Sequence, residues 1–144
     1  MTRRSGFTVL ELVIVMAVII ILAAIAIPIG LNAQREAKEA KLRAELRELR
    51  NAINRFVAEC GGYPEKLEDL MADDPPRACR SLEDGSRMPI NPRDFRGPYL
   101  YTPDEQFPKD PITGKQLWSY NRRTGHVSSR APGAAVDGTL YGDW

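Results

Sequence analysis

The stretch FTVLE at residues 7–11 opens a run of uncharged residues that decides the fold of this chain. In full, residues 7–29 read FTVLELVIVMAVIIILAAIAIPI, and Glu11 is the only charged side chain between Ser5 and Gln34. A helix rises about 1.5 Å per residue and a bilayer core needs roughly 20 residues, so this run is long enough to span a membrane. A carboxylate within such a span is energetically unfavourable, which makes Glu11 a candidate functional residue.

Two ordinary interpretations of the span start from its flanks. Arg3 and Arg4 precede it, so we expect the N-terminus to stay in the cytoplasm and the remainder to be exported. A cleaved secretory signal is one interpretation, because Ala24-Ile25-Ala26 has the small-x-small pattern of a cleavage site, but the run exceeds the roughly 7–15 apolar residues of a signal. A plain uncleaved anchor is the other. Neither explains a glutamate five residues after Gly6 at the head of the span.

The residues at the head of the span resemble a known processing site. Gly6-Phe7-Thr8-Val9-Leu10-Glu11 is similar to the motif of type IV prepilins and of their relatives, the type II secretion pseudopilins. In that family a dedicated peptidase cuts after the glycine on the cytoplasmic side and methylates the new N-terminal residue. The resemblance implies cleavage between Gly6 and Phe7, N-methylation of Phe7, and a role for Glu11 in filament assembly. Val9 stands where leucine is more usual.

Composition predicts one small, nearly neutral exported domain. The chain has 144 residues, with 20 Lys and Arg against 19 Asp and Glu, so a uniformly basic surface for nucleic acid is not supported. The two cysteines are Cys60 and Cys79, and outside the cytoplasm we expect a disulfide between them. Two buried free thiols are the alternative.

Residues 33–59 predict a helical segment that continues the apolar one. They are rich in Ala, Glu, Lys, Arg and Leu and contain neither proline nor glycine. Apolar residues recur at spacings of four and three, which indicates one buried face. This seam consists of Leu42, Leu46, Leu49, Ile53, Phe56 and Cys60. It lasts under three heptads, so we expect it to pack on the C-terminal part of its own chain rather than in a coiled coil. Pro28 is expected to bend or locally melt the long helix.

From Gly61 onward the sequence is typical of a loop-rich head. Gly61-Gly62 is expected to end the helix with a left-handed cap, and Pro64–Met71 to form a short helix. Residues 72–96 are expected to be a polar, turn-rich loop. Short strands are expected at 99–102, 117–120, 126–129 and, as a fourth, 139–141, with a hairpin turn at 121–125. The predicted fold class is α+β: a long N-terminal helical spine, with a transmembrane half and an amphipathic half, packed on a small antiparallel sheet.

Parts of the head resemble the major pseudopilin of type II secretion. Gly97-Pro98-Tyr99-Leu100 and Pro108-Lys109-Asp110-Pro111 are similar to its segment leading into the sheet, and Cys60-Gly61-Gly62-Tyr63-Pro64 to its helix-ending turn. That family has a C-terminal calcium loop richer in Asp and Gly than this one. The resemblance leaves Asp137 and Asp143, with backbone carbonyls, as candidate calcium ligands, and calcium takes about six to eight oxygens. Ordinary turn aspartates are the alternative, and no other cofactor is expected.

The residue pattern does not predict an enzyme. His126 is the only histidine, and Ser128 and Ser129 beside it in sequence do not make a catalytic triad. There is no glycine-rich phosphate loop and no paired metal motif. Arg122-Arg123 at the expected hairpin tip is interpreted as a solvated turn rather than a DNA contact.

These observations predict a structural subunit of a helical pilus-like filament. The expected domains are a cleaved leader at 1–6, a transmembrane and filament-core helix at 7–30, and a soluble head at 31–144 that includes the amphipathic spine 33–60. The subunit is expected to cross the inner membrane once, with its N-terminus cytoplasmic and its head periplasmic, before it enters an extracytoplasmic filament. Expected partners are other copies of the chain, prepilin peptidase, an inner-membrane assembly platform and minor pilins or pseudopilins.

Three functions stay open at this point. We favour the major pseudopilin of a type II secretion system, which assists protein export. A type IV pilin for adhesion, motility or DNA uptake is the close alternative. A membrane-tethered binding domain or enzyme that never polymerises is the alternative from another class.

Overall fold

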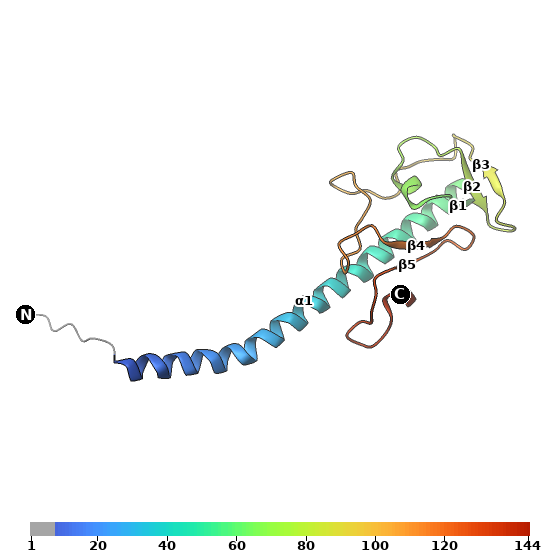
Figure 1. Ribbon diagram of the computed structural model, residues 1–144. Coiled ribbons are helices and arrows are strands. Elements are labelled where there is room, and N and C mark those ends of the chain that lie inside the picture. Colours follow the sequence, from blue (N-terminus) through green and yellow to red (C-terminus); the bar gives the residue numbers. More distant parts are fainter. Residues whose placement is uncertain (1–7) are drawn as a thin grey trace, which may run out of the picture. The chain divides into compact units, whose positions relative to one another are not determined.

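The computed structural model describes residues 8–144, apart from the side chains of residues 28 and 29. Contacts divide the chain into two units, one ending at Ala37 and the other running from Lys38 to Trp144. One helix, α1 (Val9–Cys60), contributes to both units and is coloured blue to green in Figure 1. The described part of the first unit is almost entirely this helix.

The helix continues through Pro28 without a break. The local melting expected there is therefore absent from the secondary structure. Proline removes a single backbone hydrogen bond. The alanine, leucine and isoleucine residues around it in the sequence keep the neighbouring turns helical.

The second unit begins with the amphipathic part of α1, which ends as predicted at a glycine cap. Gly61 adopts φ +76° and donates its N–H to the carbonyl of Val57 at 2.9 Å. The next residue starts β1 (Gly62–Pro64), where a Cβ on Gly62 would lie 2.4 Å from the carbonyl oxygen of Arg80. Only glycine permits this close approach of the two strands.

Three strands form the first sheet, in the order β1-β2-β3, all antiparallel. The 3-10 helix η1 (Leu67–Met71) follows β1, within the segment predicted to be helical. Next come β2 (Ala78–Ser81) and β3 (Arg87–Pro89), so the prediction of a plain loop over 72–96 is wrong. Both strands are short and lack a clear apolar alternation, which is why the sequence pattern did not reveal them.

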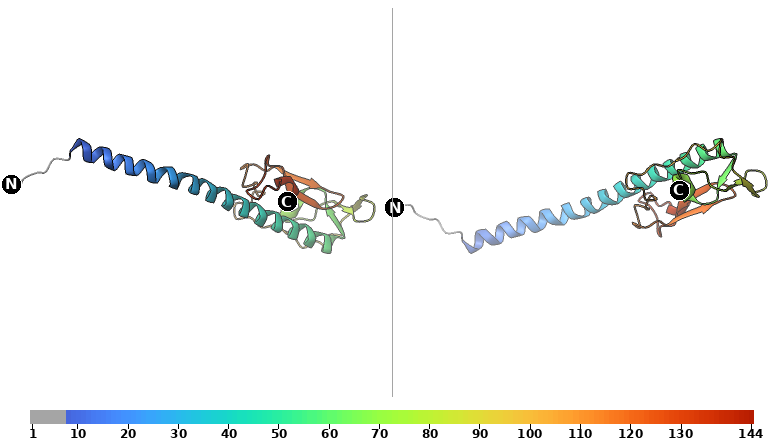
Figure 2. Two further views of the ribbon diagram at one scale, coloured as in Figure 1. Left: turned by 90° about the horizontal axis from the view of Figure 1, so that it is seen from below. Right: turned by 90° about the horizontal axis from the view of Figure 1, so that it is seen from above.

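A hairpin of β4 (Trp118–Asn121) and β5 (His126–Ser129) forms the second sheet, with Tyr120 opposite Val127. Both strands were predicted from the sequence. The hairpin lies beside the C-terminal half of α1 in the views of Figure 1 and Figure 2.

Two expected strands are not formed. The N–H groups of Tyr99 and Leu100 both donate to the carbonyl of Leu70, at 2.8 and 2.9 Å, which ties this segment to η1 instead of a sheet. Near the C-terminus, Leu140 makes only an isolated bridge with Ala134 before the 3-10 helix η2 (Tyr141–Asp143).

The predicted seam of α1 is the core of the second unit. All six of its side chains are at most 8% exposed, and they pack with the head as expected for an intrachain seam. Phe56 meets Phe95 and Tyr99 edge to face, with ring centroids 6.4 and 5.4 Å away. Val127, fully buried, brings β5 into the same cluster. The fold class is α+β as predicted, with two small antiparallel sheets rather than one.

Candidate functional site

The described residues begin at the capped N-terminus of α1. Thr8 Oγ1 accepts a hydrogen bond from the backbone N–H of Glu11 at 3.3 Å. Thr-x-x-Glu is the spacing of a capping box, and a carboxylate in the first turn also complements the positive end of the helix dipole. Sequence analysis missed this local role, although the Thr8-to-Glu11 spacing is its signal. Gly6 and Phe7, the predicted cleavage and methylation residues, lie outside the described residues.

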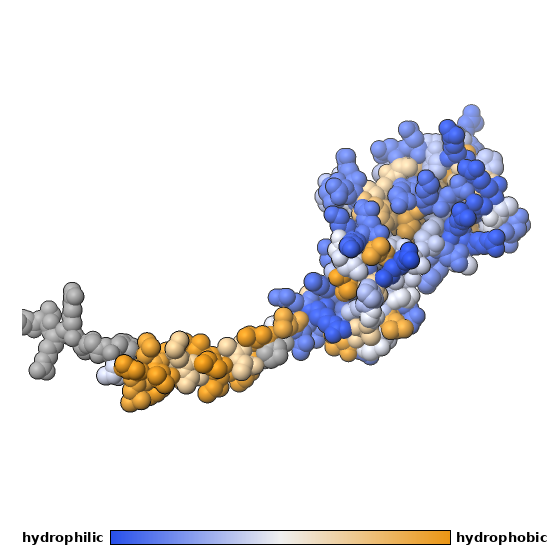
Figure 3. Space-filling view, viewed as in Figure 1, coloured by the Kyte–Doolittle hydropathy of each residue, from blue (hydrophilic) through white to orange (hydrophobic). Residues whose placement is uncertain are grey.

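The apolar part of α1 is not covered by the described residues of its own chain. Among the described helices, α1 is long and apolar enough to cross a membrane, judged by length and composition. Its large apolar side chains stay exposed on every side of the helix, for example Ile20 at 68%. Figure 3 shows this continuous apolar surface in orange. A patch of this size requires a bilayer or other protein chains to cover it.

The second unit contains a buried carboxylate that holds the C-terminal loop. Glu39, only 3% exposed, accepts hydrogen bonds from the N–H of Val136 at 3.1 Å and from the hydroxyl of Tyr141 at 2.9 Å. A buried charge requires such partners. Sequence analysis suggests Glu39 only as an i, i+4 partner of Arg43 and misses its burial. The signal was its position three residues before Leu42, which extends the buried seam by one turn.

The two predicted calcium ligands lie near the C-terminus, and the surroundings of Asp137 do not fit a calcium site. One carboxylate oxygen of Asp137 pairs with Arg43 at 3.0 Å. The other accepts hydrogen bonds from the N–H and the hydroxyl of Thr139, at 3.0 and 2.6 Å. Asp143 lies in η2. No group of three or more His, Cys, Asp or Glu side chains that could hold a metal ion exists within the described residues.

Arg43 provides a positive charge beside Asp137. Its guanidinium also lies 4.0 Å from the ring centroid of Trp144, a cation–π contact. Trp144 Nε1 donates to Thr139 Oγ1 at 2.7 Å, which closes the network. The hydrogen bonds from Thr139, followed by the charge of Arg43, lower the pKa of Asp137.

The predicted disulfide is not present in the structure. Cys60 and Cys79 are both free and buried, and Cys79 Sγ lies 3.7 Å from the carbonyl oxygen of Cys60. Cys60 Sγ lies 3.9 Å from the hydroxyl of Tyr99. Burial raises the pKa of both thiols. The fold thus brings the two residues together at the end of α1, and their oxidation outside the cytoplasm stays a prediction.

The side chains near the histidine serve the fold. His126 is exposed at the start of β5. Ser129 donates its hydroxyl to the fully buried Asp110, which also accepts the N–H of Ile112 at 2.7 Å. Asp110 was quoted in the sequence only as part of a resemblance. Its position between Lys109 and Pro111 gave no separate signal of burial.

Comparisons with known proteins place this chain in a class. Residues 1–27 match the prokaryotic N-terminal methylation motif. The chain is 31% identical over 112 residues to type II secretion system core protein G of Aeromonas hydrophila, a match covering 74% of this chain and 78% of that protein. It is 41% identical over 68 residues to type IV major pilin protein PilA of Myxococcus xanthus (strain DK1622), covering 47% of this chain and 31% of that pilin. No solved structure gives a significant match.

The chain belongs to the family of type IV pilins and type II secretion pseudopilins. The resemblance noted at its N-terminus is thereby confirmed. Within that family, the match that covers more of this chain is to the secretion-system protein.

Proposed function

We propose that this chain is a structural subunit, without enzymatic activity, of a helical pilus-like filament, and specifically the major pseudopilin of a type II secretion system. The observation that carries the proposal is the long apolar surface of α1, left exposed by its own chain and headed by Glu11. A bundle of such helices in a filament buries this surface, as the membrane does before assembly.

The proposed path begins in the inner membrane. Arg3 and Arg4 keep the N-terminus cytoplasmic, and the head lies in the periplasm. Prepilin peptidase cuts after Gly6 and methylates Phe7. An inner-membrane assembly platform, with minor pilins or pseudopilins, then moves the subunit into the filament.

Cleavage creates a partner for Glu11. The new amine of Phe7 stays protonated when methylated, and no Lys or Arg lies between residues 5 and 34. Glu11 lies four positions after Phe7, about 6 Å along a helix. A contact between Glu11 of one subunit and the Phe7 amine of its neighbour would fix the axial stagger of the helices, because a buried ion pair can set register.

We favour the secretion system over the pilus because of the share of each relative's length that its match to this chain spans. The match to the core secretion protein spans 78% of that protein, whereas the match to the type IV pilin spans 31% of the pilin. The higher identity of the shorter match favours the alternative, a type IV pilin for adhesion, motility or DNA uptake. No metal ion enters the proposal, because the surroundings of Asp137 do not fit calcium.

Three experiments test the proposal. N-terminal mass spectrometry of the membrane-extracted chain is expected to find a methylated Phe7, whereas a chain starting at Ile27 would indicate a secretory signal. Electron microscopy of sheared cell surfaces is expected to show filaments containing this chain. A deletion strain separates the two systems: lost export of folded proteins identifies a pseudopilin, and lost adhesion, motility or DNA uptake a pilin. A processed chain that forms no filament would support the tethered-domain alternative.

A further inference from the structure

A tandem repeat on α1, Glu45-Leu46-Arg47-Glu48-Leu49-Arg50, has no role in the function proposed above. An α-helix has 3.6 residues per turn, so each residue is turned by about 100° from the last. The two leucines of the repeat are at most 1% exposed and belong to the buried seam. The glutamates therefore lie along one side of the seam and the arginines along the other.

This separation of charge is unfavourable in an isolated helix. Side chains three or four residues apart are neighbours, and like charges there destabilise a helix by a few tenths of a kcal/mol. Glu45 and Glu48 are such a pair, as are Arg47 and Arg50. Neither arginine has an acidic residue at these spacings, and Glu48 has no basic one. Of these four residues, only Glu45 has an oppositely charged neighbour at such a spacing, which is Lys41, four residues before it.

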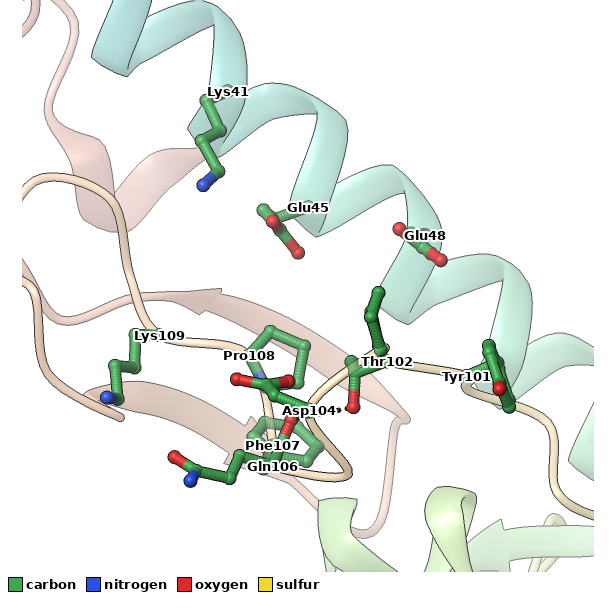
Figure 4. Close-up of a pocket in the computed structure, with 11 residues that line it drawn as sticks. Lys41, Glu45, Glu48, Tyr101, Thr102, Asp104, Gln106, Phe107, Pro108 and Lys109 are labelled. Carbon is green, nitrogen blue, oxygen red and sulfur yellow. Dashed lines mark hydrogen bonds between the residues drawn. The ribbon is translucent and has the colours of Figure 1, made fainter.

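The acidic side of the helix faces a groove of about 470 Å³. Figure 4 shows Glu45 and Glu48 on α1 above the loop formed by residues 101–109, which carries Asp104. Within the described residues, Glu45, Glu48 and Asp104 form no ion pair, whereas Glu65 and Asp137 are paired with arginines. The groove therefore has three carboxylates without an ion-pair partner in the described part of the chain.

Other side chains limit where a cation can enter this groove. Lys41 and Lys109 lie on the same side of the view in Figure 4, away from Tyr101. Tyr101 is 80% exposed and borders the groove. Its ring can receive a guanidinium by a cation–π contact. Burial, and then the charge of Glu48, raise the pKa of Glu45, as expected for crowded carboxylates.

The opposite side of the same helix carries the positive charges of Arg47 and Arg50. Arg47 is exposed, and its Nε donates to the carbonyl of Arg43 at 3.3 Å. Arg50 donates to the carbonyl of Val127 at 3.1 Å. A carbonyl does not neutralise a guanidinium, so both keep their full charge. These arginines, with Trp144, border a hollow of about 320 Å³.

We propose that the acidic groove of one subunit receives the Arg47 side of a second copy of this chain. The inference rests on the proposed filament function and names a contact within it. Each copy carries both halves of the contact, so it repeats from copy to copy, as a heterologous interface does in an open filament. Opposite charges on the two surfaces attract and fix their register.

Charge reversal tests this contact in the full chain. Arg47→Glu and Glu48→Arg each place like charges across the interface, so each is expected to lower the yield of sheared filaments by roughly tenfold or more. Arg47→Glu/Glu48→Arg restores opposite charges with the two sides exchanged, and is expected to recover most of the yield. Both residues are exposed, and each reversal replaces a like-charge pair on α1 by an opposite-charge one, so the thermal unfolding temperature of the purified chains should not fall.

Controls separate this contact from the filament proposal. Glu83→Arg and Arg122→Glu reverse exposed charges on turns outside the groove, and should leave the filament yield unchanged. Filaments of the wild type with normal yields from both single reversals would refute the contact and leave the filament function standing. Loss in both single variants without recovery in the double variant would also refute the contact. Absence of wild-type filaments would instead refute the proposed function.

Discussion

The two units of this chain place similar apolar side chains on one helix in opposite surroundings. Ile20, in the first unit, is 68% exposed, whereas Leu49, in the second, is fully buried under the head. Both positions are helical, so helix formation does not distinguish them. The difference is the source of the cover: the chain supplies it for one half of α1, and a membrane or other subunits must supply it for the other. Substitutions in the two halves should therefore affect different properties.

The largest effect is expected from Glu11→Ala. This change removes the carboxylate proposed to pair with the Phe7 amine of a neighbour, so we expect normal processing and a folded head but no filaments. Electron microscopy of sheared filaments measures the loss, with a check for mature protein in the membrane. Glu36→Ala, an exposed glutamate on the same helix, is the matched control and should assemble. Normal filaments from the Glu11 variant would leave that residue without the assigned role.

A core truncation compares the two halves directly. Leu49→Ala leaves a cavity in the head and should lower its free energy of unfolding by about 2–5 kcal/mol. Ile20→Ala removes an exposed side chain of the first unit, so the same measurement should not change. Thermal unfolding of the purified full chain in detergent, followed by near-ultraviolet circular dichroism, distinguishes the two. Equal shifts would contradict the division into a covered and an uncovered half.

The cysteine pair tests the junction between α1 and the first sheet. If oxidation joins Cys60 to Cys79 after export, the closed loop stabilises the head by about 3 kcal/mol in the chain-entropy estimate, and Cys79→Ala removes that gain. We expect intact-mass analysis of the exported, denatured chain to show no alkylation until a reductant is added. Two alkylated thiols without reductant would show that the free pair of the structure persists outside the cytoplasm.

In the head, the elements that could be predicted from the sequence are those with a regular spacing of apolar residues or a distinctive turn residue. The seam from Leu42 to Cys60 follows directly from its spacing, and the cap at Gly61 from the conformational freedom of glycine. The strands β2 and β3 did not follow, because three or four residues without alternation leave no period to detect. The contacts of Glu39 and Asp137 join positions about a hundred residues apart, and such pairing is decided by tertiary packing rather than by local pattern.

The predicted site residues also differ in how far the local sequence determines them. The processing motif is a contiguous signal, so it could be recognised from residues 6–11 alone. The calcium prediction depended on geometry that a sequence does not contain. The fold places Arg43 and Thr139 against the carboxylate of Asp137, and neither contact has a signal in the local sequence.

The smallest effect is expected from Asp137→Asn, which weakens the attachment of the C-terminal loop to α1. The hydrogen bonds of Thr139, and then Arg43, hold the pKa of Asp137 below its unfolded value, so this carboxylate stabilises the fold above about pH 4. That contribution is lost as the pH falls through the lowered pKa of the folded state. The melting temperature of the variant should therefore lie slightly below that of the wild type at pH 7, and the difference should vanish as the pH falls below that lowered pKa. Asp143→Asn is the matched control, since its carboxylate has no ion pair within the described residues, and its melting temperature at pH 7 should equal that of the wild type. A melting temperature of the wild type that falls when calcium is chelated would contradict the assignment of Arg43 as the cation beside Asp137.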